Sequence, residues 1–95
     1  MNKLELKFRF RAIKELLEIT NLEIAEIDKL RLDFTKTSLI AYIGNKHAGG
    51  KLTIDEIEDM IDEDGTLIKY ILKEFSEQIL KYLVPNETSQ SPLPN

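Results

Sequence analysis

Two aspartates and a glycine, Asp62, Asp64 and Gly65, have the spacing of part of a calcium-binding loop. An EF-hand loop needs a carboxylate at position one, a glycine at position six and a bidentate glutamate at position twelve. With Gly65 at position six, Met60 falls at position one and Ile71 at position twelve, and neither supplies a carboxylate. We therefore expect an acidic turn in which Gly65 follows a helix, without a bound metal ion.

His47 is the only histidine, and cysteine is absent. A hydrolytic site needs a nucleophile beside the histidine, and a zinc site needs further histidine or cysteine ligands that this sequence does not place nearby. His47 follows Lys46 and precedes Gly49-Gly50 at the predicted end of a helix, where a cationic side chain is favoured. We expect a capping or exposed histidine.

Gly49-Gly50-Lys51 has a superficial likeness to a phosphate-binding loop. That motif requires a strand, the pattern G-x-x-x-x-G-K-[ST] and then a helix. Here a helix is predicted before the glycines, the first motif glycine is missing, and Leu52 stands where the hydroxyl residue belongs. We expect a turn that ends a helix, and no nucleotide site.

Acidic residues dominate the segment 55–64, which contains no basic residue. Paired carboxylates can act as general acid and base when burial shifts their pKa values, but an exposed helix face provides no such burial. The sequence therefore predicts a binding protein with no catalytic residue, cofactor or metal ion. The acidic face of this predicted helix consists of Asp55, Glu56, Glu58, Asp59 and Asp62.

Composition and charge narrow the class of partner. The formal net charge of −4 disfavours nucleic acid, whose backbone rewards clustered lysine and arginine. No apolar run approaches the roughly 18 residues of a membrane helix, so we expect a soluble protein without membrane contact. The N-terminal residues 3–14 are nevertheless basic. This basic end and the acidic segment are either two solvated faces or surfaces that attract each other within one molecule or between copies.

The N-terminal third predicts a strand followed by a helix. Leu4, Leu6 and Phe8 alternate with charged residues, which favours a short strand through about residue 8. The spacing then becomes helical, and we predict a helix over 9–19. A lone strand needs a partner for its backbone, so the weak strand candidate 30–33, or another copy of the chain, is expected beside it.

The middle of the chain predicts a buried central helix. Residues 22–27 form a short apolar stretch of one or two helical turns that ends by Asp28. Asp33 is a plausible N-cap for a helix over 34–47, whose middle carries no charge and should be buried on most sides. Gly49-Gly50 should end it.

The last two elements carry clear signals. Thr53 and Glu56 form a capping box that starts an amphipathic helix ending near Asp62. A helix over 66–83 has an apolar stripe and ends before Pro85. We predict a single domain over residues 1–84 and a flexible tail over 85–95. The fold class is mainly α: a small helical domain of about four helices with one short N-terminal β-strand.

Three apolar residues lie off the main stripes of their predicted helices: Ile19, Tyr70 and Leu80. Each alone means little, because single exposed apolar residues are normal on a folded protein. Together with an unpaired strand they would leave apolar surface for a partner. We take these three residues as the candidate partner-binding set.

The order of these features resembles a known family. The pattern Leu4-x-Leu6-x-Phe8-x-Phe10-Arg11-Ala12-Ile13-x-x-Leu16, the central helix 34–47 and the segment 52–62 are similar to those of small tail assembly chaperones of long-tailed (siphovirus-type) bacteriophages. The likeness covers about residues 3–83 and is one of pattern, without an invariant catalytic motif.

This resemblance implies a chaperone that binds and solubilises the tape measure protein during tail morphogenesis. It also implies release as tail tube protein polymerises around the client, self-association into a homo-oligomer, and action in the host cytoplasm with absence from the mature virion. The competing interpretation is a small acidic inhibitor or immunity-type protein that presents the 55–64 helix to a basic partner.

Overall fold

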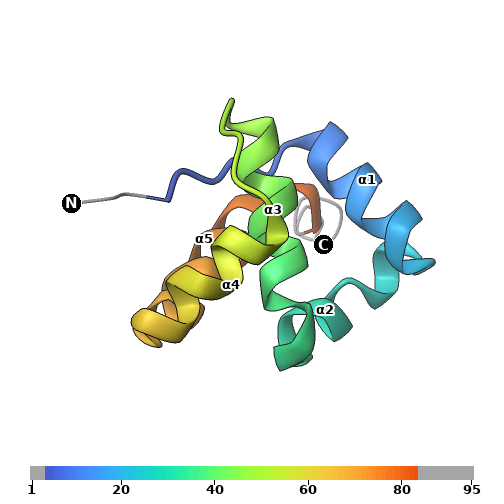
Figure 1. Cartoon of the computed structure of the whole chain (residues 1–95). Coiled ribbons are helices and arrows are strands. Elements are labelled where there is room, and N and C mark those ends of the chain that lie inside the picture. The colour runs from blue at the N-terminus through green and yellow to red at the C-terminus, as the bar shows by residue number, and fades with distance from the viewer. Residues whose placement is uncertain (1–3, 84–95) are drawn as a thin grey trace, which may run out of the picture.

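The computed structural model describes residues 4–83, which form five α-helices and two short 3-10 helices, with no strand among them (Figure 1). The predicted mainly helical fold is confirmed. The predicted tail 85–95, and Lys3 at the start of the predicted strand, lie outside the described residues. No helix within 4–83 combines the length and apolar character needed to cross a membrane. The elements are α1 (Phe10–Thr20), η1 (Ile24–Glu26), α2 (Asp28–Leu32), η2 (Phe34–Lys36), α3 (Thr37–His47), α4 (Ile54–Glu63) and α5 (Thr66–Leu83).

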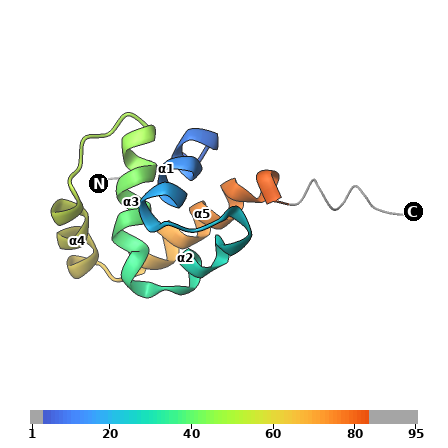
Figure 2. The ribbon, with the colours of Figure 1, turned by 90° about the vertical axis from the view of Figure 1, so that its right-hand side faces the viewer.

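Helix α3 is the centre of the fold. It contacts α1, α2, α4 and α5, and the two views of the ribbon show these helices arranged around it (Figures 1 and 2). Ile40, Ala41 and Ile43 of α3 are completely buried. The uncharged middle of this helix is thus enclosed on most sides, as its composition predicts.

Side-chain capping marks the start of η2 and of α4. The Thr53 hydroxyl accepts a hydrogen bond from the Glu56 N–H at 3.1 Å, and the Glu56 carboxylate accepts one from the Thr53 N–H at 2.9 Å. The predicted capping box is therefore confirmed. Asp33 accepts from the Thr35 N–H, but it caps η2 rather than α3, which begins at Thr37. The predicted helix begins at residue 34, whereas α3 begins at Thr37, because the 3-10 helix η2 precedes it.

The predicted N-terminal strand is not formed by residues 4–9. Leu4, Leu6 and Phe8 are buried and the residues between them are exposed, so the alternation is real. Residues 4–9 nevertheless form no strand, because no strand within residues 4–83 pairs with them. The weak candidate 30–33 is also wrong, since α2 covers most of that range.

Side chains of α3 and α5 take the place of a partner strand. Gln78 accepts from the Phe8 N–H at 2.8 Å and donates to the Leu6 carbonyl at 3.1 Å. The Tyr70 hydroxyl donates to the Leu4 carbonyl at 2.8 Å. Two further hydrogen bonds attach the segment to α3. Asn45 Nδ2 donates to the Glu5 carbonyl, and the Lys7 N–H donates to the Gly44 carbonyl. The segment has internal partners, so the expectation that an unpaired strand drives self-association loses its basis.

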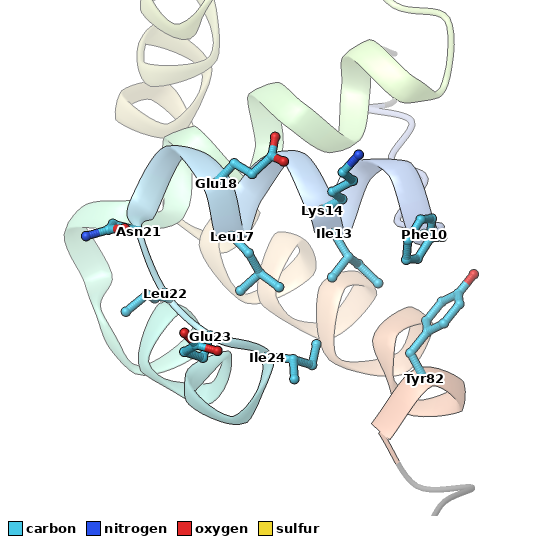
Figure 3. A pocket seen from close by; sticks show the side chains of 10 residues that line it. All are labelled: Phe10, Ile13, Lys14, Leu17, Glu18, Asn21, Leu22, Glu23, Ile24 and Tyr82. Atoms are coloured by element: carbon cyan, nitrogen blue, oxygen red, sulfur yellow. The ribbon is translucent and has the colours of Figure 1, made fainter.

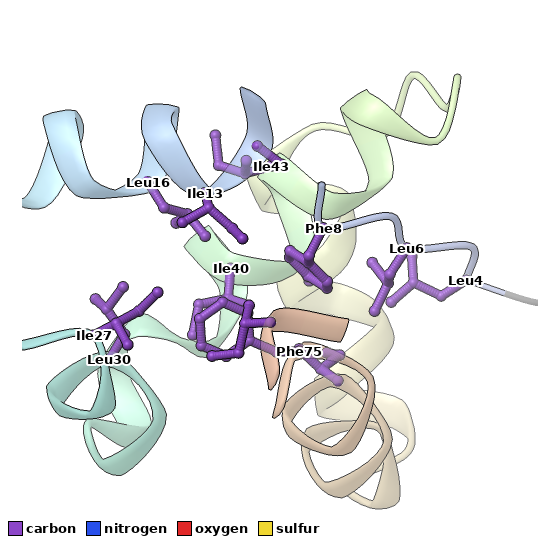
Figure 4. Close-up of a cluster of buried hydrophobic side chains, with 14 of the residues drawn as sticks. Leu4, Leu6, Phe8, Ile13, Leu16, Ile27, Leu30, Ile40, Ile43 and Phe75 are labelled. Atoms are coloured by element: carbon purple, nitrogen blue, oxygen red, sulfur yellow. The ribbon is translucent and has the colours of Figure 1, made fainter. Parts of the chain in front are cut away.

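The core joins this segment to the last helix. The rings of Phe8 and Phe75 meet edge to face, with centroids 5.1 Å apart and planes inclined by 76° (Figure 4). A Cβ at Gly44 would overlap the ring of Phe8, so the glycine gives the ring room against α3. The close approach of the segment to α3 therefore depends on a residue without a side chain.

Candidate functional site

An open apolar groove runs between α1, the segment that follows it, and the end of α5 (Figure 3). Its volume is about 530 Å³. Phe10 is 65% exposed and Ile24 is 45% exposed, so the groove presents large apolar side chains to solvent. We call this feature the α1 groove and define it by its apolar residues Phe10, Ile13, Leu17, Leu22, Ile24 and Tyr82.

The wall opposite α1 is set by the way α1 ends. Asn21 adopts the left-handed conformation, with φ of 59°. The Asn21 N–H bonds to the Glu18 carbonyl at 3.3 Å and the Leu22 N–H bonds to the Leu17 carbonyl at 3.0 Å. These two bonds form a Schellman motif, which turns the chain sharply at the helix end. Leu22 and Ile24 therefore lie across from the apolar face of α1.

A second hollow of about 570 Å³ adjoins the α1 groove and shares Phe10 and Tyr82 with it. We call it the basic cleft, because its other lining residues are Lys7, Arg9, Arg11 and His47. The side chains of Lys7, Arg9 and Arg11 take part in none of the salt bridges formed within residues 4–83. Their charge is thus available to a ligand.

His47 and Lys46 at the end of α3 are held by Glu15 of α1. The Glu15 carboxylate lies 2.6 Å from Lys46 Nζ and 2.8 Å from His47 Nε2. The hydrogen bond from Lys46, followed by that from His47, lowers the pKa of Glu15. His47 is therefore bound to a structural carboxylate. Within residues 4–83, no hydrogen bond joins it to a side chain that could act as a nucleophile.

The predicted acidic face lies on α4 and is exposed at each of its five residues. Glu56 is engaged in the capping box, and Glu58 accepts a hydrogen bond from the Ser38 hydroxyl at 2.8 Å. None of the salt bridges within residues 4–83 involves a carboxylate of α4. Glu58 and Asp62 also line a smaller hollow of about 340 Å³ beside Phe34 and Ile61.

The loop motifs serve as helix boundaries. Asp64 accepts hydrogen bonds from the N–H and the hydroxyl of Thr66 at the start of α5, and these bonds lower the pKa of Asp64. Gly49 follows α3 with a φ of 94°. Within residues 4–83, no group of three or more potential ligands is arranged to hold a metal ion.

The three residues predicted to bind a partner differ in exposure, and none of them lines the α1 groove. Ile19 on α1 and Leu80 on α5 are 54% and 53% exposed, but neither lines the α1 groove. Tyr70 is half-buried, and its hydroxyl donates a hydrogen bond to the Leu4 carbonyl. Burial also raises the pKa of Tyr70, with smaller contributions from nearby carboxylates. Tyr70 lies off the apolar stripe of α5, and there it attaches the N-terminal segment to the helix.

Sequence reasoning missed the residues that define the groove. Phe10 and Tyr82 lie at apolar positions of the predicted helices 9–19 and 66–83, and Ile24 lies in the short apolar stretch 22–27. The width of the apolar face on α1 was a usable signal. Ile13, Leu16 and Leu17 share one face of α1, and Leu17 is only partly buried whereas Ile13 and Leu16 are buried.

A scan against protein-family models and searches of curated proteins and of solved structures found no match to this chain.

Proposed function

We propose that this protein is a tail assembly chaperone of a long-tailed bacteriophage, which binds and solubilises the tape measure protein. The α1 groove is the observation that carries the proposal, because it gathers several apolar side chains around one hollow, with Phe10 and Ile24 exposed among them. An exposed apolar surface of this kind is typical of a protein that binds a partner. The family resemblance of residues 3–83 supplies the identity of the client.

The shape of the groove suits one side of an amphipathic helix. Its walls come from two helices and a turn, so apolar side chains on successive helical turns, about 5.4 Å apart, can enter between them. Such a shallow contact is weak by itself. Many copies bound along a long helical client gain strength from multivalency and remain individually reversible.

This role places the protein in the cytoplasm of the bacterial host, before the tail is complete. Tail tube protein that polymerises around the client would displace the bound copies, so the mature virion would lack them. Self-association into a homo-oligomer remains part of the proposal. It would have to use exposed side chains, because the N-terminal segment already has partners inside the chain. The proposal assigns no catalytic residue and involves neither nucleic acid nor membrane.

Co-expression tests the proposal. The full chain would be produced together with the tape measure protein of the same tail gene cluster, and the soluble fraction of the client would be measured with and without it. We expect the client to stay soluble and to co-purify with the chain at both low and high salt, because apolar contacts resist screening. An insoluble client, or a soluble client that never co-purifies, would refute the proposal.

One observation favours a second candidate function. The α4 carboxylates are exposed and form no salt bridge within residues 4–83, as a protein that inhibits a basic partner would require. Binding through these groups should weaken steeply as salt rises. The combined variant Asp55→Asn, Asp59→Asn and Asp62→Asn should abolish inhibition by such a protein. It should leave capture of the client by a chaperone intact.

A further inference from the structure

We propose that the α1 groove selects a client helix that carries carboxylates at one end of its apolar stripe, and that these carboxylates contact Lys7, Arg9 and Arg11. This inference rests on the proposed function of the groove, and it adds the charge and the orientation of the segment that binds there. It follows from how the α1 groove and the basic cleft are joined.

The two hollows meet at the same two side chains. Phe10 and Tyr82 line both of them, so a ligand that leaves the α1 groove past these rings enters the basic cleft. Figure 3 shows Phe10 and Tyr82 together at one end of the groove, with Asn21 at the other. A helix long enough to fill the groove would therefore place its next turn against the cleft.

The two ends of the groove carry opposite charge. Lys7, Arg9 and Arg11 line the basic cleft together with Phe10. Glu18 and Glu23 line the groove further along, towards Asn21 (Figure 3). A bound helix with carboxylates at the cleft end meets opposite charge there. The reversed helix would set its carboxylates against Glu18 and Glu23. Complementary charge of this kind fixes orientation and partner choice more than it raises affinity.

The cleft cations are available because the nearby carboxylate, Glu15, already has other partners. Glu15 binds Lys46 and His47, and no salt bridge within residues 4–83 includes Lys7, Arg9 or Arg11. This basic area also stands out on a chain whose formal net charge is −4. An acidic amphipathic helix fits the apolar groove and the cleft together, whereas a phosphate backbone would leave the apolar groove unused.

Peptide binding to a full-length reporter tests the inference. The chain has no tryptophan, so Phe10→Trp places a single one at the junction of the two hollows, where it can be excited selectively over the tyrosines. Three synthetic helical peptides would share one apolar stripe and differ only at one end, which carries three glutamates, three glutamines or three lysines. We expect the glutamate peptide to bind about fivefold to tenfold more tightly than the lysine peptide at low salt, as a few exposed ion pairs allow.

Charge reversal supplies the matched control. Arg9→Glu combined with Arg11→Glu should invert the order of the glutamate and lysine peptides, whereas Lys69→Glu, an exposed α5 residue outside both hollows, should leave it unchanged. High salt, about 1 M, should bring the three affinities together without abolishing binding, because it screens the charges and leaves the apolar contact.

The outcomes separate this inference from the function on which it rests. Equal binding of the three peptides, or preference for the lysine peptide, would overturn the charge inference and leave the groove as the client site. Failure of every peptide to bind would overturn both. A tryptophan signal that changes only on dilution of the chain itself would show that a second copy fills the groove, and would also overturn the inference.

Discussion

Gln78 of α5 hydrogen-bonds the backbone N–H of Phe8 through its side-chain Oε1 at 2.8 Å, across 70 positions of sequence. Its Nε2 group donates to the carbonyl of Leu6 at 3.1 Å. One amide side chain thus serves two residues of the N-terminal segment as a neighbouring strand would. The segment in turn carries Phe8 into the core and leads directly into α1, which forms one wall of the groove.

Gln78→Met should therefore destabilise the protein. The substitution keeps the length of the side chain but leaves one part-buried N–H and one part-buried carbonyl without their partner, which costs about 1–3 kcal/mol. The free energy of unfolding, measured by urea denaturation, checks this. Glu77→Met is the control, since Glu77 is exposed and forms only a surface ion pair with Lys73. A loss at Gln78 no larger than that at Glu77 would contradict the assigned role.

Gly44→Ala should destabilise the protein through a steric clash. The added Cβ would overlap the ring of Phe8, which is enclosed in the core, and overpacking of this kind costs about 1–3 kcal/mol. Gly65→Ala is the matched control, because a Cβ at Gly65 meets open space. Thermal unfolding of the two variants should separate them clearly. Equal melting temperatures would show that Phe8 moves aside without cost.

The contacts of Glu15 with Lys46 and His47 should make a small, pH-dependent contribution to stability. Its pKa is lowered in the folded protein from an ordinary value of 4.5, chiefly by the hydrogen bond from Lys46. A lowered carboxyl pKa stabilises the fold above the unfolded value, and the contribution disappears as pH falls through the folded value. Glu15→Gln should reduce the free energy of unfolding at pH 7 by about 0.5–1 kcal/mol, as expected for a part-exposed pair.

Urea denaturation of Glu15→Gln and of the wild type, repeated from pH 7 down to pH 3, measures this contribution. The two stability curves should converge in the acid range. Glu18→Gln is the control on the same helix, because Glu18 forms no salt bridge within residues 4–83. A difference at Glu15 that persists unchanged at pH 3 would indicate a packing effect instead of an ion pair.

Local signals in the sequence were enough to predict most of the helical framework. The capping box at Thr53 and Glu56 forms as expected, and α5 spans Thr66–Leu83, the predicted range. Asn21 ends α1 in the left-handed conformation. Each of these features depends on residues within a turn or two of one another, so the sequence carries the information directly.

Long-range relationships could not be predicted in the same way. The alternation of Leu4, Leu6 and Phe8 correctly indicated an extended, half-buried segment, but nothing local identified Gln78 and Tyr70 as its hydrogen-bond partners. The α1 groove was missed for a related reason. A helical stripe shows which face is apolar, whereas the coverage of Phe10 and Tyr82 depends on where distant elements stop.

The central claim is that the α1 groove binds the client, and one substitution tests it most directly. Ile24→Asp places a charge in the groove wall at a residue that is 45% exposed, so the fold should tolerate it. Leu32→Asp is the matched control, because Leu32 is 77% exposed and lies outside the groove. Circular dichroism and urea denaturation would first establish that both variants fold like the wild type.

The deciding measurement is the soluble fraction of the tape measure protein when it is co-expressed with the wild type, with Ile24→Asp or with Leu32→Asp. We predict that the wild type and Leu32→Asp keep the client soluble, and that Ile24→Asp fails. A buried charge at a central contact weakens binding by at least about tenfold, roughly 1.4 kcal/mol. If Ile24→Asp solubilised the client as well as the wild type does, the groove could not be the client-binding site.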